Sequence, residues 1–173
     1  RGTTSVSKEK DKDKRQPVWV YWSPNSKKFA LTRTDYREVD DLWVINSVAN
    51  PRPTLETYKY HMPGEANAPQ VEMQVFDIAT EASIMVQADT FKDQTLGIIG
   101  APRLASSRDD DRRPAIWLSP DNDKVYFYRT SRDLKRIDLC MADANTGEVT
   151  TIIEERLNIY VETKSPQLVN GGE

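Results

Sequence analysis

One turn sequence that occurs twice limits, more than any other feature, what this chain can fold into. Residues 22–34 read "WSPNSKKFALTRT", and at a constant offset residues 118–130 read "LSPDNDKVYFYRT". Each copy has a Ser-Pro turn followed by an apolar segment that ends in Arg-Thr, which is typical of a β-hairpin. A second match pairs "VFDIATEASIMV" with "CMADANTGEVTTII" at a shorter offset. The chain therefore contains a repeat whose first unit carries an insertion.

The second unit shows what is repeated. Short β-rich segments alternate there with the polar turns "PDND" and "ANTGE", which is the pattern of an antiparallel meander of about four strands. Repeats of four-stranded sheets are characteristic of a β-propeller, whose blades bury their faces against one another. We therefore expect an all-β fold, a partial β-propeller of about two four-stranded antiparallel blades and the start of a third. A β-sandwich also combines short strands with polar turns, but the repeated turn favours the propeller.

Turn signals and changes in composition predict the parts of the chain. The charged, aperiodic beginning is typical of a mobile arm or loop, and the insertion in the first blade is expected to protrude as a hairpin. The expected parts are a charged mobile arm or loop at 1–17, a first blade at 18–88 with its hairpin insertion at 41–62, a connecting segment or short helix at 89–113, a second blade at 114–155 and the start of a further blade at 156–173. The chain has no initiator Met and stops where a turn begins, so we expect it to be a piece of a longer protein.

Composition excludes several classes of partner and site. The net charge of −3 and the pI near 5.3 leave no broad basic field for a nucleic acid backbone. No apolar run approaches the roughly 20 residues that a membrane-spanning helix needs. Cys140 is the only cysteine, which excludes an internal disulfide and cysteine-rich metal sites. Asp109, Asp110 and Asp111 are flanked by arginines and are expected to form a solvated loop, so we predict neither a metal site nor a cofactor.

The four tryptophans are further candidates for a binding platform. Trp22 and Trp117 stand at strand ends before the repeated turn, where the core of a blade requires bulk. Trp19 belongs to the short β-rich run before the first of these turns. Trp43 differs, because it falls in the apolar stretch 42–45 of the inserted hairpin. That stretch is apolar enough to be buried against a partner.

Several segments together resemble a known family. "WSPNSKKFALTRTD", "YKYHMPGEANAP", "VFDIAT", "SRDLKRIDLCMADANTGEV" and "IIEERLNIYVET" are similar to the N-terminal β-propeller of dipeptidyl peptidase IV-like serine peptidases, in the prolyl oligopeptidase family S9. The likeness covers nearly all of residues 18–163, and its most specific part is the loop "YHMPGEAN" at 60–67. The resemblance implies a fragment of an exported enzyme, periplasmic, extracellular or at the cell surface. In such an enzyme the propeller gates access and helps to position the N-terminus of a peptide substrate, and a C-terminal α/β-hydrolase domain of the same chain cleaves it.

Catalytic residues are not expected in this chain itself. Hydrolases of this kind carry the nucleophilic Ser in a Gly-x-Ser-x-Gly turn, with an Asp and a His further along the chain. No two of the 7 glycines frame a Ser in this way, and His61 is the only histidine. Because His61 lies in a polar loop without an activated nucleophile, we expect it to be solvent-exposed or packed within the loop.

A substrate-binding site is harder to place. The resemblance implies paired glutamates that bind the free amine of the substrate, ahead of the first Ser-Pro turn, but only Glu9 precedes that turn, so the pair cannot be carried over. Glu154 and Glu155 end a strand, where solvated charges are routine. Tyr160 and Glu162, in the linker to the next blade, are the weak remaining candidates for substrate binding, because such a linker can face the central channel. The alternative for this linker is an ordinary interblade strand.

Two functional interpretations stay open from the sequence. In one, the chain is a non-catalytic piece of a dipeptidyl peptidase IV-type exopeptidase, whose partners are peptide substrates and the hydrolase domain. In the other, it belongs to a propeller-like interaction or scaffold protein without peptidase activity. In both, an open stack of blades leaves apolar faces without neighbours, so we expect self-association through those faces.

Overall fold

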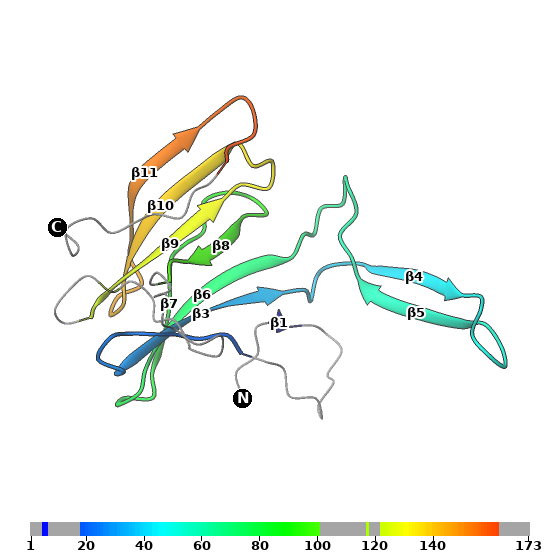
Figure 1. The fold of residues 1–173 in the computed structure, drawn as a ribbon, viewed down its shortest axis with the longest axis horizontal. Helices are drawn as coiled ribbons and strands as arrows, with labels where there is room; N and C mark the ends of the chain where they lie inside the picture. The colour runs from blue at the N-terminus through cyan, green and yellow to red at the C-terminus, as the bar shows by residue number, and fades with distance from the viewer. Residues whose placement is uncertain (1–4, 7–17, 101–116, 118–121, 163–173) are drawn as a thin grey trace, which may run out of the picture.

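The computed structural model describes residues 5–6, 18–100, 117 and 122–162, and in these residues it contains strands but no helix (Figure 1). The first sheet contains β1 (Ser5–Val6), β2 (Tyr21–Trp22), β3 (Lys28–Asp35), β6 (Gln70–Asp77) and β7 (Ser83–Met85). The second sheet contains β8 (Thr95–Ile98), β9 (Lys124–Thr130), β10 (Arg136–Asp143) and β11 (Val149–Arg156). The third sheet is the hairpin of β4 (Asp41–Asn46) and β5 (Thr54–Lys59). No helix able to span a membrane occurs in the described part of the chain.

In the two larger sheets the strands follow one another in chain order, as in the blades of a propeller. β2, β3, β6 and β7 pair antiparallel to form what we call the first blade, and β1 adds a short parallel edge to β3. β8, β9, β10 and β11 pair antiparallel in the same way to form the second blade. An immunoglobulin-type sandwich would instead alternate its strands between two sheets. The structure therefore confirms an all-β, partial propeller, and neither sheet closes into a barrel.

The first strand of the second blade lies in an unexpected place. β8 falls within residues 89–113, which the sequence assigned to a connecting segment or short helix. Gly97 interrupts its apolar pattern, and glycine lowers strand propensity, so the sequence signal for this strand is weak. Of residues 114–121, which carry the repeated Ser-Pro turn and its preceding segment, only Trp117 is described. The predicted boundaries of the parts stay predictions.

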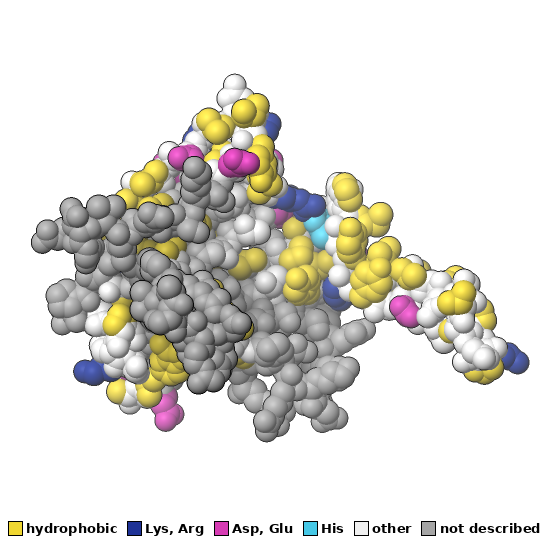
Figure 2. Space-filling view, viewed as in Figure 1, with side chains coloured by type: hydrophobic (Ala, Val, Ile, Leu, Met, Phe, Trp, Pro, Cys, Tyr) yellow, Lys and Arg dark blue, Asp and Glu magenta, His cyan; other side chains and the backbone are white. Residues whose placement is uncertain are grey.

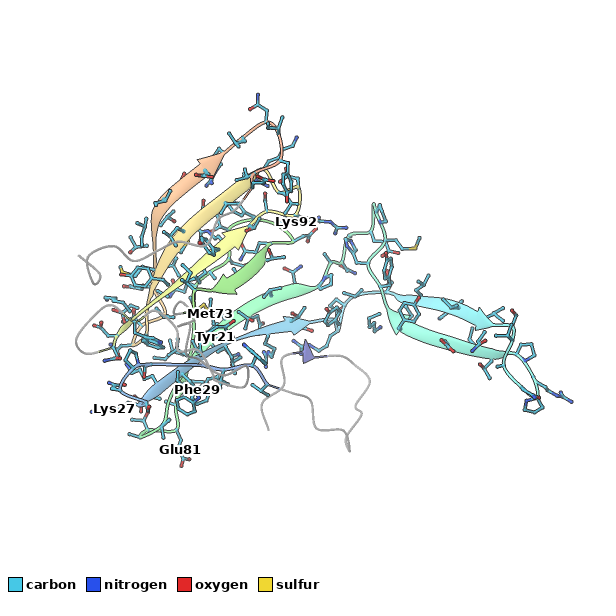
Figure 3. The ribbon with its side chains drawn as sticks, viewed as in Figure 1. Tyr21, Lys27, Phe29, Met73, Glu81 and Lys92 are labelled. Carbon is cyan, nitrogen blue, oxygen red and sulfur yellow. The ribbon has the colours of Figure 1, made fainter. Side chains whose placement is uncertain are left out.

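The hydrophobic core lies between the two blades. Strand alternation explains its composition, because every second residue of β9, beginning with Val125 and Phe127, is buried. Figure 3 shows Met73 between the two blades. The cluster of buried residues in this core is Ala30, Met73, Val75, Val86, Ala88, Ile98, Trp117, Val125, Phe127, Cys140, Ala142 and Ala144. The two sheets thus bury their facing sides against each other, which is how adjacent blades of a propeller pack.

The repeated turns have matching backbone features where both copies are described. The fourth residue of the Ser-Pro turn is Ser26 in the first blade and Asn122 in the second, and their φ angles are 57° and 54°. Asp77 and Asp143 also occupy equivalent turns, since each carboxylate accepts hydrogen bonds from the backbone amides two and three residues later, at 2.8–3.1 Å. The second sequence match therefore corresponds to structurally equivalent turns, and in the first match the described turn residue, Ser26 or Asn122, has the same conformation in both copies.

The inserted hairpin stands away from the blades. β4 and β5, with the turn between them, form the segment Asp41–Lys59, which we call the arm, and it extends sideways from the first blade (Figure 1). Its register runs from Asp41↔Lys59 to Asn46↔Thr54. One side of the arm carries Trp43, Ile45 and Leu55, which are 71%, 69% and 64% exposed. Such exposure of large apolar side chains is unusual for a protein surface and indicates a contact surface.

Candidate functional site at the loop end of the blades

Four connections meet at one end of the two blades, which we call the loop end. They are the two sides of the base of the arm (36–40 and 60–69), the segment after β7 (86–94), the β9–β10 turn (131–135) and the segment after β11 (157–162). Figure 3 shows Lys92 at this end, and Lys27 and Glu81 at the opposite end, where the Ser-Pro and Asp turns lie. The functional candidates Tyr160, Glu162 and His61 all belong to the loop end.

The segment that carries Tyr160 and Glu162 is hydrogen-bonded through its backbone to the β9–β10 turn. The backbone amide of Leu157 donates to the Lys135 carbonyl, and the amide of Val161 donates to the Leu134 carbonyl, both at 3.0 Å. The Val161 side chain is buried, whereas Tyr160 is 61% exposed and Glu162 is exposed as well. The two candidate side chains therefore project to solvent from a backbone that is held in place.

Glu154 and Glu155 do not form a convergent pair. Both are exposed at the end of β11, and Glu154 Oε2 lies 3.3 Å from Arg156 Nη2. A carboxylate that is paired with a neighbouring arginine in solvent resembles an ordinary surface ion pair. This geometry agrees with the solvated charges that the sequence predicts for the strand end.

A buried ion group lies just inside the loop end. Arg129 Nε donates to Asp138 Oδ2 at 2.6 Å, and Arg156 Nη2 lies 2.6 Å from Asp138 Oδ1. The Asp138 side chain is completely buried, and Arg129 Nη2 also donates to the Thr151 hydroxyl at 2.9 Å. Buried charges require such partners, because an unpaired charge would lose the solvation it has in water. The group therefore ties β9, β10 and β11 together across the blade.

Phe91, in the segment after β7, completes this group. Its ring is approached by three guanidinium groups, with distances from the centroid of 5.7 Å for Arg129, 4.8 Å for Arg136 and 5.2 Å for Arg156. Guanidinium groups at these distances are attracted to the face of an aromatic ring. The loop that carries Phe91 is held by buried Gln94, whose side chain accepts from the Phe91 amide at 3.0 Å. Phe91 thus fixes the connection between the two blades to the charged end of the second blade.

His61 joins the base of the arm to the second blade. Its Nε2 lies 3.0 Å from the Glu65 carbonyl, and Nη1 of Arg132 in the β9–β10 turn contacts its Nδ1. In Figure 2 the histidine appears in cyan where the arm meets the blades. These partners are a backbone carbonyl and a guanidinium rather than a nucleophile, so the ring has a packing role, as the sequence predicts.

The groups with shifted pKa values stabilise turns. The hydrogen bond from Lys124 and backbone amides lower the pKa of Asp143, and the amide of Thr80 is the main cause that lowers the pKa of Asp77. Burial raises the pKa of Tyr128 and that of the Cys140 thiol, which makes this thiol a poor nucleophile. None of these groups is arranged as an acid–base pair in the described residues, and those residues hold no cluster that fits a metal ion.

The tryptophans separate into buried and exposed positions. Trp117 is buried in the core between the blades, whereas Trp22 is half-buried and packs with its ring centroid 5.2 Å from that of Phe29, outside that core. Trp19 and Trp43 are both mostly exposed. The acidic run 109–111 lies outside the described residues. The arm is therefore the place where exposed apolar side chains gather most clearly.

Sequence reasoning missed the buried ion group. Arg129 was visible as the Arg of the repeated Arg-Thr ending, and Asp138 stands in the alternating segment "RIDLCMAD". An Asp at a core position of a strand is the signal that could have been used, because a buried carboxylate needs a basic partner. The partner Phe91 could not be found in this way, since it lies in the connection between the blades, far along the chain from Arg129 and Asp138.

Comparisons with known proteins agree with the fold. Residues 15–173 match the family described as the dipeptidyl peptidase IV N-terminal region. A protein assigned as dipeptidyl aminopeptidase IV from Bacteroides ovatus is 25% identical, with a TM-score of 0.61 over 83% of this chain and 18% of its own. Porphyromonas gingivalis dipeptidyl peptidase 4 is 16% identical, with a TM-score of 0.62 over 82% of this chain and 18% of its own. The second likeness bears on the fold alone.

The chain is much shorter than the proteins that it resembles. It spans 18% of the length of each of these two solved structures. No curated protein sequence matches it. Because the family match covers nearly the whole chain in one continuous stretch, we conclude that the chain belongs to the dipeptidyl peptidase IV N-terminal region family.

Proposed function

We propose that this chain is a non-catalytic propeller segment of an exported, S9-type serine dipeptidyl peptidase. The single observation that carries the proposal is the continuous family match over residues 15–173, together with the small share of each solved relative that the chain covers. In the parent protein a C-terminal α/β-hydrolase domain performs the cleavage. The propeller gates access to it and helps to position the peptide N-terminus.

The loop end is the surface that supports this role best. It gathers the connections of both blades and the base of the arm, and connections between rigid strands are where binding residues are usually placed. Glu162 would accept hydrogen bonds from the substrate ammonium, and the Tyr160 ring would pack against an apolar part of the peptide. The fixed backbone of residues 157–162 supports this assignment, because it limits the freedom lost when a peptide binds.

The activity of the chain and of the parent can be tested separately. The purified chain should not release the chromophore from a Gly-Pro or Ala-Pro chromogenic amide, whereas the full-length parent should. Turnover by the chain alone that a serine-directed phosphonate blocks would contradict the assignment. The absence of turnover by a folded parent would favour the interaction protein instead.

The proposed roles of Glu162 and Tyr160 are tested by substituting each residue in the parent enzyme. Glu162→Gln should raise KM for a dipeptide amide by about tenfold with little change in kcat, because one charge-assisted hydrogen bond to the bound substrate is lost. Glu155→Gln is the matched control, since Glu155 is an exposed glutamate at the end of β11, and it should leave KM unchanged. Tyr160→Ala should also raise KM. Equal behaviour of the two glutamate variants would exclude Glu162 from the site.

An interaction or scaffold protein is the second candidate. The exposed apolar side of the arm, with Trp43, Ile45 and Leu55, favours it, because such a surface is costly to leave in water. The coding sequence beyond Glu173 distinguishes the two candidates. A downstream Gly-x-Ser-x-Gly turn followed by Asp and His supports the peptidase, and its absence supports the scaffold.

Self-association is part of the same proposal. Rings of Trp22, Phe29 and Phe76 form a row on the side of the first blade that faces away from the second, with centroid distances of 5.2 Å and 5.0 Å. Figure 3 shows Phe29 at this side of the sheet. The three rings are half-buried, and the part of them left in water supports pairing of blade faces in the isolated chain, since propeller blades normally bury such faces.

A further inference from the structure

The outer edge of β11 is a long strand edge that has no neighbour in the described part of the chain. β11 is the last strand of the second blade, and no described strand pairs with its other side (Figure 1). It has 8 residues and no proline, whereas β7, the outer strand of the first blade, has 3 residues. Such an edge offers backbone N–H and C=O groups to another strand. In a closed propeller the faces of a blade are covered, but its outer edge stays free.

A β-bulge determines which backbone groups β11 presents at this edge. Successive residues of an antiparallel strand point these groups alternately toward the neighbouring strand and away from it. The Glu148 carbonyl accepts from the Asp143 amide and the Leu157 amide donates to the Lys135 carbonyl, so both ends of β11 are fixed. Ile152 is skipped in the register with β10, which shifts the alternation by one residue. Counted from the two ends, the residues whose backbone groups point away from β10 are Val149, Thr151, Glu154 and Arg156.

These four residues match one another in a second copy of the strand. When two copies of β11 run antiparallel about a twofold axis at the bulge, Val149 lies opposite Arg156 and Thr151 lies opposite Glu154. Each pair joins two residues with free backbone groups, so each pair can exchange N–H···O bonds in both directions. A strand without the bulge would place a free residue opposite one that already bonds to β10. The extra residue therefore makes this edge self-complementary.

The side chains along the edge fit the same register. Ile152 and Ile153, which are 48% and 53% exposed, lie opposite each other at the centre, where their contact removes apolar surface from water. Glu155 lies opposite Thr150, whose hydroxyl can donate to the carboxylate. An axis at Glu154 or Glu155 would instead bring acidic side chains together, which destabilises a strand pair. The order of charges along β11 thus favours the register centred on the bulge.

We propose that the edge of β11 is a contact surface for a second copy of this chain, with the two strands antiparallel and Thr150 opposite Glu155 of the other copy. The second blades of the two copies then form one continuous sheet. The contact differs from a pairing of blade faces, because it uses backbone groups at the rim and leaves the faces uncovered. Glu154 and Glu155 discourage pairing with unrelated strands and so contribute to the choice of partner.

Disulfide cross-linking tests this register. Thr150→Cys and Glu155→Cys are introduced together, because opposite residues that do not bond through their backbones have Cα atoms about 4.5 Å apart, which a disulfide can bridge. Within one extended strand the two positions are about 17 Å apart, so no internal disulfide can form between them. Cys140 is buried, which hinders its access to an oxidant. Thr150→Cys with Glu154→Cys is the matched control, since it moves one cysteine by a single residue and to the other side of the sheet.

At micromolar protein concentration with a mild oxidant, the 150/155 variant should form a covalent dimer about tenfold faster than the 150/154 control, because strand pairing raises the effective concentration of its thiols. Non-reducing electrophoresis and mass spectrometry measure the product. Glu154→Pro, added to the 150/155 variant, should remove this advantage, because proline lacks the N–H that the second copy needs and that bonds nothing in β10. Circular dichroism establishes that each variant keeps its β-sheet structure.

Two results would overturn the edge contact. One is equal cross-linking of the 150/155 and 150/154 variants, including the absence of a covalent dimer from both, because chains that meet only through blade faces would not favour residue 155 over residue 154. The other is undiminished cross-linking when Glu154→Pro is present in a folded chain. Neither result affects the proposed peptidase function, because the measurement does not involve turnover.

Discussion

Arg129 and Arg33 occupy equivalent positions in the two blades, but only Arg129 is buried. Each forms a cross-strand ion pair, Arg129 with Asp138 and Arg33 with Glu72, and both pairs have an N–O distance of 2.6 Å. The side chains of the first pair are 9% and 1% exposed, whereas those of the second are 31% and 32% exposed. The segment after β7 covers the Arg129 pair, since Arg129 Nη1 donates to the Ala88 carbonyl at 3.4 Å and the Phe91 ring lies against the guanidinium, whereas the Arg33 pair stays partly exposed. The same kind of ion pair is therefore buried in the second blade and partly exposed to solvent in the first.

This difference predicts unequal costs when each pair is broken. Asp138→Asn leaves Arg129 and Arg156 without their buried carboxylate and should lower the free energy of unfolding by about 3–5 kcal/mol. Glu72→Gln, the matched control in the other blade, should cost at most about 1 kcal/mol, because its pair is screened by water. Urea unfolding followed by circular dichroism measures both. Equal losses in the two variants would show that the segment after β7 does not shield the Arg129 pair.

A second prediction concerns Gly147, in the β10–β11 turn of the second blade, which lies against the end of β7 in the first blade. A Cβ atom at this position would lie 2.2 Å from the Met85 carbonyl oxygen, and the residue has a φ of +78°. Gly147→Ala should therefore destabilise the protein by at least about 3 kcal/mol, from the strained backbone and the clash together. Gly64→Ala is the control, because Gly64 has a φ of +93° but no atom within 4 Å of its Cβ position. It should cost about 1–2 kcal/mol, and thermal unfolding compares the two.

If both glycine variants lose the same stability, the close approach at Met85 would not be the cause. The Gly147 carbonyl also accepts from the Gln87 amide at 2.8 Å, so the clash would be expected to disturb this link between the blades. Hydrogen exchange at Gln87 provides a local measurement. Its protection should fall in Gly147→Ala and persist in Gly64→Ala.

The third prediction is a loss of stability in acid that depends on Asp143. The hydrogen bond from Lys124 lowers the pKa of Asp143 below its ordinary value of 3.8 in the folded chain. A carboxyl with a lowered pKa in the folded state contributes stability above the pKa of the unfolded state, and this contribution is lost as the pH falls through the folded pKa. The free energy of unfolding should therefore decrease as the pH falls below about 4. Asp143→Asn should show a smaller decrease over the same range, and a pH series of urea melts tests this.

The fourth prediction is that the blades fold without the arm. The Tyr60 amide donates to the Asp40 carbonyl at 3.1 Å, so the two ends of the arm already lie side by side. Replacing Asp41–Lys59 by a short turn that contains Gly should preserve the β-sheet circular dichroism spectrum and a cooperative urea transition. The arm contributes no residue to the buried cluster between the blades, which is the physical reason. Loss of the cooperative transition would show that the arm is part of the core.

The fold was predictable from the sequence where local turn chemistry fixes it. Ser26 and Asn122 mark the same turn, and Asp77 and Asp143 another, because each turn is stabilised by residues within it. Strand β8 was not predictable in this way. Its short segment around Gly97 becomes a strand through pairing with β9, a partner that is distant in the chain. Tertiary pairing, not local propensity, determines such a strand.

In the candidate site, too, some features could be predicted from the local sequence and others depend on tertiary contacts. The exposure of Tyr160 agrees with a linker position, and this much could be expected from its place after the last strand. The contact of His61 with Arg132 joins residues from two repeat units, so no local pattern indicates it. The approach of Phe91 to the arginines of the second blade is of the same kind. Contacts between segments distant in the chain thus require the structure, whereas turns stabilised by their own residues do not.

The last prediction is that the isolated chain associates with itself. Ile159 is 73% exposed and Ile153 is 53% exposed, while the rings of Trp22, Phe29 and Phe76 are half-buried on the side of the first blade that faces away from the second. Burial of about 400 Å² of apolar surface would contribute about 10 kcal/mol before the cost of association is subtracted. We expect dimers or larger oligomers at micromolar concentration, by pairing of faces or by exchange of the segment after β11.

Sedimentation velocity of the wild type and of Ile159→Asp tests this expectation. The charge at residue 159 should shift the distribution toward monomer, because a carboxylate that is buried in an apolar contact loses its solvation. Glu155→Asp, an exposed change that keeps the charge, is the control and should associate like the wild type. A compact wild-type monomer up to a concentration of about 100 µM would contradict the prediction, because association at micromolar concentration corresponds to a net free energy of about 8 kcal/mol.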